Sequence, residues 1–595
     1  MRSRRISSFL LVGLLVGAGL VAATPAAAQA TEQPLARGFG GAVVSDTLES
    51  TEAGLEVLRR GGTAADAAVA VAAVLGVTDP FVAGLGGGGY FVFYDARRHR
   101  VFTIDGRETA PRAADANLFI DPATGQPYAF ATAVTSGLSV GVPGMLATWQ
   151  RSLDRWGRFS LAQNLQPAIR VADAGFVVDT AIRDQIVGNQ QRFAQFTSTR
   201  DLFLPGGAPP AVGTVLRNPD LADTYREIAR RGIGAFYGGP IGRDMVDAVR
   251  NLPLAPDATI TPIPGRMTLD DVRAYRTIDR DPTHMRYRGL DVYGMAPSSS
   301  GGITVGLSLN ILERSNLSEL DRVQALHRYL ESTRLAFADR NRYIGDPAFV
   351  DVPQRQLLSD RFARQRACLI DPDHAATSPV PPGDPFGPGQ CPQPSAGVAA
   401  GEEGMHTNHF AVSDRWGNVV SYTNTIESLG GAGIVVPGRG FLLNNELTDF
   451  NFTPTQGSAP DPNLPDAGKR PRSSMSPTIV LKHGRPFLAV GSPGGSTIIT
   501  TVIQILLNRI DFGMTLPEAI AAPRATQRNT PTTVAEPAFQ AAVGPALMAL
   551  GHTFTTQTSI GVAAGLEFLP HGEVIAAGEP TRRGGTSAGV VHPRP

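Results

Sequence analysis

The sequence predicts an α+β protein that folds as one large unit. Apolar spacing typical of helices dominates the first part of the chain, whereas alternating apolar residues typical of strands dominate the last third. With 42% hydrophobic residues among 595, the chain holds ample apolar material for a large core, which excludes disorder as the main state. No internal repeat or long low-complexity linker divides it.

The charge balance argues against a nucleic-acid partner. The chain carries 53 Lys and Arg against 53 Asp and Glu, so it offers no basic surface for phosphates. A small-molecule ligand is the better expectation.

The first 30 residues have the pattern of a secretory signal peptide. Three arginines in residues 2–5 precede an uncharged run, residues 9–23, and small residues before a cleavage point after Ala30. The alternative, a membrane anchor, needs about 20 apolar residues, and this run is shorter. No later stretch is apolar enough to span, so the mature chain from residue 31 is expected to be exported, periplasmic or extracellular.

Helices are expected first along the mature chain. Thr51 is expected to cap a short helix that ends at residues 61–62, and Thr63 with Asp66 resembles a capping box that opens a buried helix to about Leu75. Further helices are expected over residues 144–156, 161–173 and 221–231.

Three hairpins are expected, two of them beyond a long connection. The connection, residues 351–405, is rich in proline and is expected to be exposed. The hairpins pair residues 90–94 with 101–104, 407–412 with 418–426, and 478–481 with 486–490, and an apolar helix, residues 498–510, follows the last.

The two cysteines, Cys368 and Cys391, flank a Pro/Gly-rich segment inside this connection. An oxidising compartment would allow them to pair, and without a clear set of His or Cys partners they make a poor zinc site. We expect a structural disulfide.

Three chemical motifs are set aside. The glycine run at residues 84–89 lacks the Lys-Ser/Thr of a P-loop and precedes a strand, so it predicts close backbone approach instead of phosphate binding. A Gly-x-Ser-x-Gly match at residues 137–141 runs into Pro143, where a nucleophile elbow would enter a helix. His406 and His409 are too few for a metal site, so no metal is expected. No organic cofactor is implied either.

At residues 404–414 (GMHTNHFAVSD) the connection gives way abruptly to a strand that begins with threonine. Here the chain resembles the gamma-glutamyltransferase family of N-terminal-nucleophile hydrolases. The resemblance spans nearly the whole mature chain, and its pieces are strong through their order and spacing. They are residues 105–111 (DGRETAP), 423–425 (TNT), 443–450 (LNNELTDF), 472–478 (RSSMSPT) and 491–496 (GSPGGS).

The resemblance implies a four-layer αββα sandwich built jointly by two chains of one precursor. The precursor would cut itself between His406 and Thr407, leaving a large chain (31–406) and a small chain (407–595). A threonine hydroxyl is inert at neutral pH, but the freed α-amine of Thr407, with a pKa of about 7.7–8 in model peptides, can act as its base.

The other catalytic roles follow residue by residue from the resemblance. Thr425 matches the threonine that orients the nucleophile. Gly494 and Gly495 match the pair whose N–H groups form the oxyanion hole, where a side chain would block the tetrahedral intermediate.

The substrate-binding roles also follow from the resemblance. Arg107, Ser473 and Ser474 match the groups that hold the substrate α-carboxylate, and Glu446 and Asp449 match those that hold its α-ammonium.

The chain departs from the family pattern in two places. Glu427 stands where many relatives have asparagine, and a carboxylate accepts from an ammonium equally well. The loop at residues 451–468, where lidded members carry an aromatic cover, has no tyrosine and only Phe452 near its start. Whether this loop acts as a lid stays open.

The favoured function is therefore transfer of the γ-glutamyl group of glutathione or related amides to water, amino acids or peptides. One alternative is an amidase of the cephalosporin-acylase kind, which accepts side chains that lack the α-amine. The other is a binding protein that never processes itself.

Overall fold

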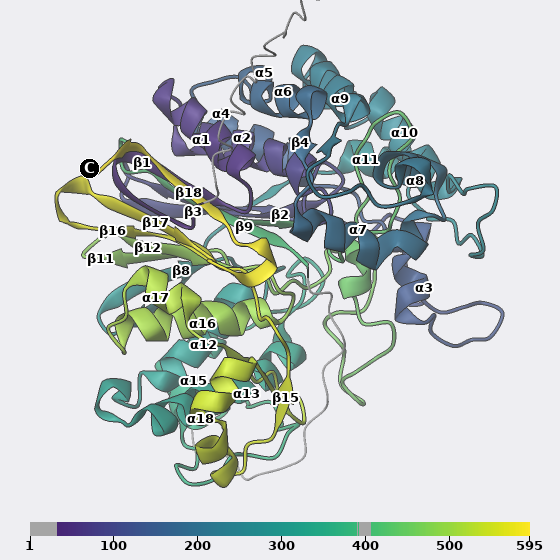
Figure 1. Ribbon diagram of the computed structural model, residues 1–595. Coiled ribbons are helices and arrows are strands. Elements are labelled where there is room, and N and C mark those ends of the chain that lie inside the picture. The colour runs from purple at the N-terminus through teal and green to yellow at the C-terminus, as the bar shows by residue number, and fades with distance from the viewer. Residues whose placement is uncertain (1–32, 389–390, 392–405, 595) are drawn as a thin grey trace, which may run out of the picture. The chain divides into compact units, whose positions relative to one another are not determined.

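A single antiparallel sheet forms the centre of the protein. The computed structural model describes residues 33–388, 391 and 406–594, so the predicted signal peptide lies outside the described residues. Within them, 13 strands pair antiparallel throughout this sheet (Figure 1). Their order is β6 (Ile278–Arg280), β3 (Arg100–Gly106), β2 (Gly88–Asp95), β10 (Val419–Thr425), β9 (Asn408–Asp414), β1 (Leu35–Ser45), β17 (Val574–Gly578), β16 (Ala564–Phe568), β12 (Arg485–Gly491), β11 (Thr478–Lys482), β8 (Leu290–Gly294) and β7 (Thr283–Tyr287), with β18 (Ser587–Pro593) on β1.

The sheet folds over so that its two halves pack face to face. Val92 of β2 and Ala411 of β9 share one buried cluster with Ile479 of β11 and Leu566 of β16. The next residue of β2, Phe93, points to the opposite face and packs among helices. This alternation along one strand places a layer on each side of it. The three predicted hairpins are confirmed as β2–β3, β9–β10 and β11–β12.

The first helical layer covers the β2–β10–β9 half of the sheet (Figure 1). Thr63 and Asp66 form the predicted capping box, and every residue of the Ala/Val-rich helix that follows is buried. The cap predicted at Thr51 is wrong. Thr47, in extended conformation at the end of the preceding turn, caps the first helix, and Thr51 lies inside it with its hydroxyl bonded to Ser587 O. The layer contains α1 (Leu48–Arg59), α2 (Ala64–Thr78), α4 (Met145–Trp156), α5 (Leu161–Asn164), α6 (Gln166–Ala174) and α9 (Pro219–Arg231).

The second helical layer packs on the β8–β11–β12 half. The predicted apolar helix is α16, residues Thr497–Ile510, and nearly all of it is buried. Two layers of strands between two layers of helices make the four-layer αββα sandwich. The other members of this layer are α12 (Gly301–Leu312), α13 (Arg322–Tyr343), α17 (Leu516–Ala521) and α18 (Pro537–Ala549).

Further helices and small strands accompany the sandwich. They are α3 (Phe130–Val134), α7 (Thr180–Phe193), α8 (Thr197–Phe203), α10 (Pro240–Arg250), α11 (Leu269–Ala274), α14 (Gln354–Leu357), α15 (Asp360–Ala367), and the small strands β4 (Phe176–Val177), β5 (Val215–Leu216), β13 (Ala525–Thr526), β14 (Thr533–Ala535) and β15 (Phe554–Thr556). In the described part of the chain, none of the helices combines the length and hydropathy needed to cross a bilayer.

The predicted exposed connection is wrong over its first third. Residues 354–357 and 360–367 form α14 and α15, and Phe362 packs in a buried cluster with α12 and α13. Arg366, one turn later, makes a buried ion pair with Asp339 at 3.0 Å. Each of these helices buries only a narrow face on its neighbours. The prolines that follow in the sequence therefore outweighed this weak helical pattern in the prediction. The predicted disulfide between Cys368 and Cys391 is present.

Candidate active site

Thr407 lies at the open end of the β9–β10 hairpin, immediately before β9. The hairpin register pairs Asn408 with Asn424, which brings the side chains of Thr407 and Thr425 together. Their hydroxyl oxygens are 3.4 Å apart. Thr425 Oγ1 also donates to the carbonyl oxygen of His406 at 3.0 Å and accepts from the Glu427 amide at 2.8 Å. One hydroxyl therefore touches both the predicted nucleophile and the predicted scissile carbonyl.

The glycine run beside this hairpin lets the backbones approach. A Cβ at Gly87 would lie 2.0 Å from Thr425 O, and one at Gly86 would lie 2.0 Å from Leu442 O. Both positions exclude any side chain, which confirms the structural interpretation of the run. Ser139 of the Gly-x-Ser-x-Gly match is buried, and its hydroxyl donates to the carbonyls of Val134 and Ser136.

One pocket gathers most of the predicted site residues, which we call the Thr407 pocket. Its cavity volume is about 20 Å³, enough for about one water molecule. Segments far apart in the sequence meet there because the two sheet halves and α16 converge on the end of β10. The lining residues are Arg107, Thr407, Thr425, Glu427, Glu446, Asp449, Ser473, Ser474, Met475, Gly495 and Ile498.

The charged residues of the Thr407 pocket are paired with one another. The Arg107 guanidinium, 1% exposed, forms ion pairs with both Glu446 and Asp449, and its Nε donates to Pro471 O at 3.2 Å. Carboxylates outnumber the cation, because Glu108 is also buried beside it. Burial raises the pKa of Glu446 and raises that of Glu108 to about 8. The pocket thus has a surplus of acid.

Two serines also line the Thr407 pocket. Ser474 Oγ accepts from the Arg340 guanidinium at 2.8 Å, and Ser473 Oγ accepts from the Met475 amide at 3.1 Å. Arg340 comes from the last turn of α13, is buried, and also donates to Ser300 Oγ. Sequence reasoning missed Arg340, since an arginine within a long helix carries no local signal of its role.

Glu427 is held in place at the pocket wall. Its backbone has a φ of 80°, in the left-handed region that non-glycine residues rarely adopt. Its carboxylate accepts from Ser428 Oγ at 2.6 Å and from the Asn445 side-chain amide. The departure from asparagine therefore adds one more fixed carboxylate to the pocket.

The two glycines predicted for the oxyanion hole connect β12 to α16. Both have positive φ, 134° at Gly494 and 55° at Gly495, and Thr497 ties the turn by donating to Gly494 O. Gly495 lines the Thr407 pocket, whereas Gly494 lines a neighbouring cavity together with His406. One glycine thus shares a cavity with each side of the predicted cleavage site, and both precede the N-terminus of α16, where partial positive charge favours an anion.

A second set of polar residues binds the backbone of Thr407 and the side chain of its neighbour Asn408. Arg583 donates to Thr407 O at 3.1 Å and forms an ion pair with Asp46, which also accepts from the Asn408 amide at 2.6 Å. Asp46 and Arg583 stand near opposite ends of the chain, so spacing offered no sign of them. Burial and nearby Arg583 lower the pKa of His406 to about 4, so its imidazole is neutral at neutral pH.

Phe452 points away from this pocket. Its ring stacks on Phe119 with centroids 4.3 Å apart and lies near Phe130. Asn451 and Asp461, bonded at 2.9 Å, close the loop on itself. The aromatic residue of this loop is therefore used in packing, not as a cover for Thr407.

Comparisons with known proteins agree with this arrangement. The sequence model of the gamma-glutamyltranspeptidase family matches residues 50–589. The chain belongs to this family. It is 39% identical to the glutathione hydrolase proenzyme of Bacillus subtilis (strain 168) over 87% of this chain and 86% of that protein. It is 34% identical to the Escherichia coli (strain K12) glutathione hydrolase proenzyme over 97% of both chains.

Among solved structures, cephalosporin acylase from Bacillus halodurans superposes with a TM-score of 0.82 at 26% identity. The match covers 96% of this chain and 99% of that one. The expected N-terminal-nucleophile hydrolase fold is confirmed.

Proposed function

We propose that this gamma-glutamyltranspeptidase family member is an exported precursor that cuts itself between His406 and Thr407. The resulting chains, 31–406 and 407–595, form a heterodimer that transfers γ-glutamyl groups from glutathione and related amides to water, amino acids or peptides. The hydrogen bond from Thr425 to His406 O, beside the Thr407 hydroxyl, is the observation that carries this proposal.

The cut uses groups already in contact. Thr407 Oγ1 adds to the His406 carbonyl carbon, and Thr425 Oγ1–H, 3.0 Å from that carbonyl oxygen, stabilises the negative charge that develops on it. Collapse breaks the peptide C–N bond as the proton lost by the Thr407 hydroxyl passes to the departing nitrogen, leaving an ester on Thr407 and a free amine. Water then hydrolyses the ester, so that His406 gains a carboxylate and Thr407 becomes a chain terminus.

Turnover reuses the same hydroxyl. The freed α-amine accepts its proton as Thr407 Oγ1 attacks the γ-carbonyl of the donor, and the leaving amine departs protonated. The N–H groups of Gly494 and Gly495 stabilise both tetrahedral intermediates. Water or an acceptor amine then removes the γ-glutamyl group from Thr407. No step requires a metal or an organic cofactor.

The paired charges explain how an amino-acid head group would be recognised. A donor carries both an α-carboxylate and an α-ammonium, so it can take the place of the internal ion pairs. Its carboxylate binds Arg107 with the two serines, and its ammonium binds Glu446 and Asp449. The cavity of about 20 Å³ must widen for this, and parting Arg107 from the carboxylates opens it.

The second candidate is an amidase of the cephalosporin-acylase kind, which the structural likeness to the Bacillus halodurans enzyme favours. A donor without an α-amine would leave Glu446 and Asp449 buried with no cation to bind, which costs free energy. Turnover of γ-glutamyl-p-nitroanilide and glutaryl-p-nitroanilide, which differ only in the α-amine, separates the two. Faster turnover of the glutaryl compound would favour the amidase.

The intact mass of the purified protein tests the cut. We expect two chains that meet between His406 and Thr407 in the wild type and in a Ser139→Ala control, and one uncut chain in Thr407→Ala. A wild type that stays uncut would favour the binding protein instead. The N-terminal residue of the large chain, expected at Thr31, tests export.

A further inference from the structure

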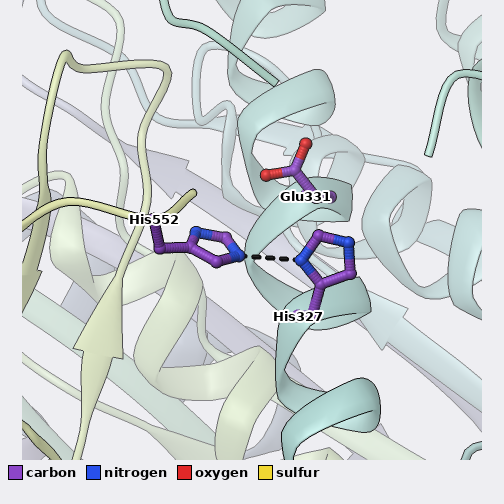
Figure 2. A group of neighbouring side chains, drawn as sticks. All are labelled: His327, Glu331 and His552. Carbon is purple, nitrogen blue, oxygen red and sulfur yellow. Dashed lines mark hydrogen bonds between the residues drawn. The ribbon is translucent and has the colours of Figure 1, made fainter. Parts of the chain in front are cut away.

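Two histidines and a glutamate meet inside the second helical layer, far from the Thr407 pocket in sequence. His327 and Glu331 lie one turn apart on α13, and His552 follows α18 (Figure 2). Their side chains are almost completely buried, at 0%, 1% and 3% exposure. One nitrogen or oxygen atom from each lies within 4.8 Å of the others. We call these three residues the histidine cluster.

The proton positions in the histidine cluster follow from its hydrogen bonds. His327 Nε2 is 2.7 Å from Asp371 O, and a carbonyl can only accept, so Nε2 carries the proton. In the neutral form of the ring, Nδ1 then has a lone pair, and it faces His552 Nε2, 2.8 Å away. A histidine that donates through one nitrogen to a backbone carbonyl, and offers the other, has the arrangement of metal-ligating histidines.

Glu331 is held just as firmly. One carboxylate oxygen accepts from Arg334, and the other accepts from the Ala376 amide at 3.0 Å. Each carboxylate oxygen has two lone pairs, so these bonds fix the group and leave lone pairs for a cation. Neutral imidazoles with one carboxylate form a donor set suited to Zn²⁺, whereas Ca²⁺ and Mg²⁺ prefer oxygen donors alone.

We infer that His327, Glu331 and His552 bind one zinc ion. His327 Nδ1, His552 Nε2 and a Glu331 oxygen are the ligands, and water can take a fourth position. The two nitrogens, now 2.8 Å apart, would separate by about half an ångström to reach the spacing of tetrahedral zinc ligands. The His552 proton moves from Nε2 to Nδ1, which has no hydrogen-bond partner among the described residues, so the ring loses no second bond.

This zinc site would join three parts of the molecule. His327 and Glu331 come from α13, their partners Asp371 and Ala376 from the segment inside the disulfide, and His552 from the C-terminal part of the chain. If the chain is cut as proposed, the ion clips the large chain to the small chain, whereas the disulfide lies wholly within the large chain. Only this last consequence rests on the proposed function.

The test is the zinc content of the full-length protein after stripping with a chelator, incubation with Zn²⁺ and dialysis, read by plasma mass spectrometry. We expect about one zinc ion per protein in the wild type and at least a tenfold loss of affinity in His552→Gln and Glu331→Gln. The His284→Gln control removes a surface histidine that is also bonded to a carboxylate, Asp291, and keeps the zinc.

Absence of zinc in a folded wild type would overturn the inference, as would full retention in both cluster variants. Because a variant can fail through misfolding, circular dichroism accompanies each measurement. Cobalt substitution supplies a second readout, since visible absorption bands in the wild type that disappear in His552→Gln report the ligands directly. Thr407→Ala separates this site from the proposed function: if uncut, it still binds zinc.

Discussion

The Thr407 pocket and the histidine cluster both bury polar groups contributed by distant segments, but they balance their charges differently. In the pocket, one arginine faces several carboxylates, so the ion pairs there can exchange for a ligand that carries both charges. In the cluster, two histidines lie against each other beside one carboxylate, and hydrogen bonds hold His327 and Glu331 in positions that suit a small cation. Buried ion pairs that can exchange suit the binding and release of a substrate, whereas ligand atoms held in place suit the lasting binding of an ion.

The largest expected effect is on the cut itself. Thr425→Val keeps the shape of the side chain but removes the hydroxyl that touches His406 O. We expect cleavage to slow by about 100-fold or more, the usual cost of one oxyanion donor, with little change in melting temperature. Cleavage is followed by electrophoresis of freshly purified precursor.

Glu331→Gln in the histidine cluster is the control for this measurement. It should leave the rate of cleavage unchanged, since it touches no group of the pocket. If both variants slow cleavage equally, the cleavage rate depends on general stability. The two sites would then not differ in their role in cleavage.

A second prediction concerns the charges of the pocket. Arg107→Met leaves Glu446 and Asp449 buried without their cation, which costs about 3 kcal/mol at pH 8. At pH 5 the loss should be smaller, because carboxylates with raised pKa values take up protons when the cation is gone. Denaturant melts at the two pH values measure this difference.

Arg112→Met is the matched control, because this arginine is largely exposed and stands five residues away. It should change stability by less than about 0.5 kcal/mol. A loss in Arg107→Met that does not depend on pH would contradict the idea of an acid surplus.

The third prediction concerns acid. Burial lowers the pKa of His409 and of His552 to about 3, from 6.5. Between pH 6.5 and pH 3 these two histidines bind protons in the unfolded chain but not in the folded one. The free energy of unfolding therefore falls as the pH drops through this range. Calorimetry should show a falling melting temperature, and His552→Gln should flatten the slope. An unchanged slope would show that His552 does not titrate on unfolding.

The smallest effect is expected for Phe452→Ala. Its ring stacks on Phe119 instead of lining the pocket, so kcat/KM for a γ-glutamyl donor should stay within about twofold while stability falls by about 1 kcal/mol. Steady-state kinetics and a thermal melt decide this. A tenfold change in kcat/KM would mean that the 451–468 loop covers the pocket during turnover.

Local patterns predicted three central hairpins and several helices of the two helical layers, and the failures have identifiable causes. The hairpins and the capping box at Thr63 depend on neighbouring residues, and they are present as predicted. Thr47 was overlooked in favour of Thr51, because two threonines four residues apart both suit a cap and only the turn after β1 selects one. Helices α14 and α15 were missed, because the partner that buries them lies elsewhere in the chain.

The sequence by itself determined the family, the fold class and the residues that gather around Thr407, because those motifs keep their order and spacing along one chain. Only the tertiary structure decided that Arg107 pairs with Glu446 and Asp449, that Arg340 supports Ser474, and that Arg583 holds Thr407 O. Sequence spacing could not predict the histidine cluster either, since His327 and His552 are separated by 225 residues. Hydrogen bonds and ion pairs act over a few ångströms, and folding alone brings such distant groups within that range.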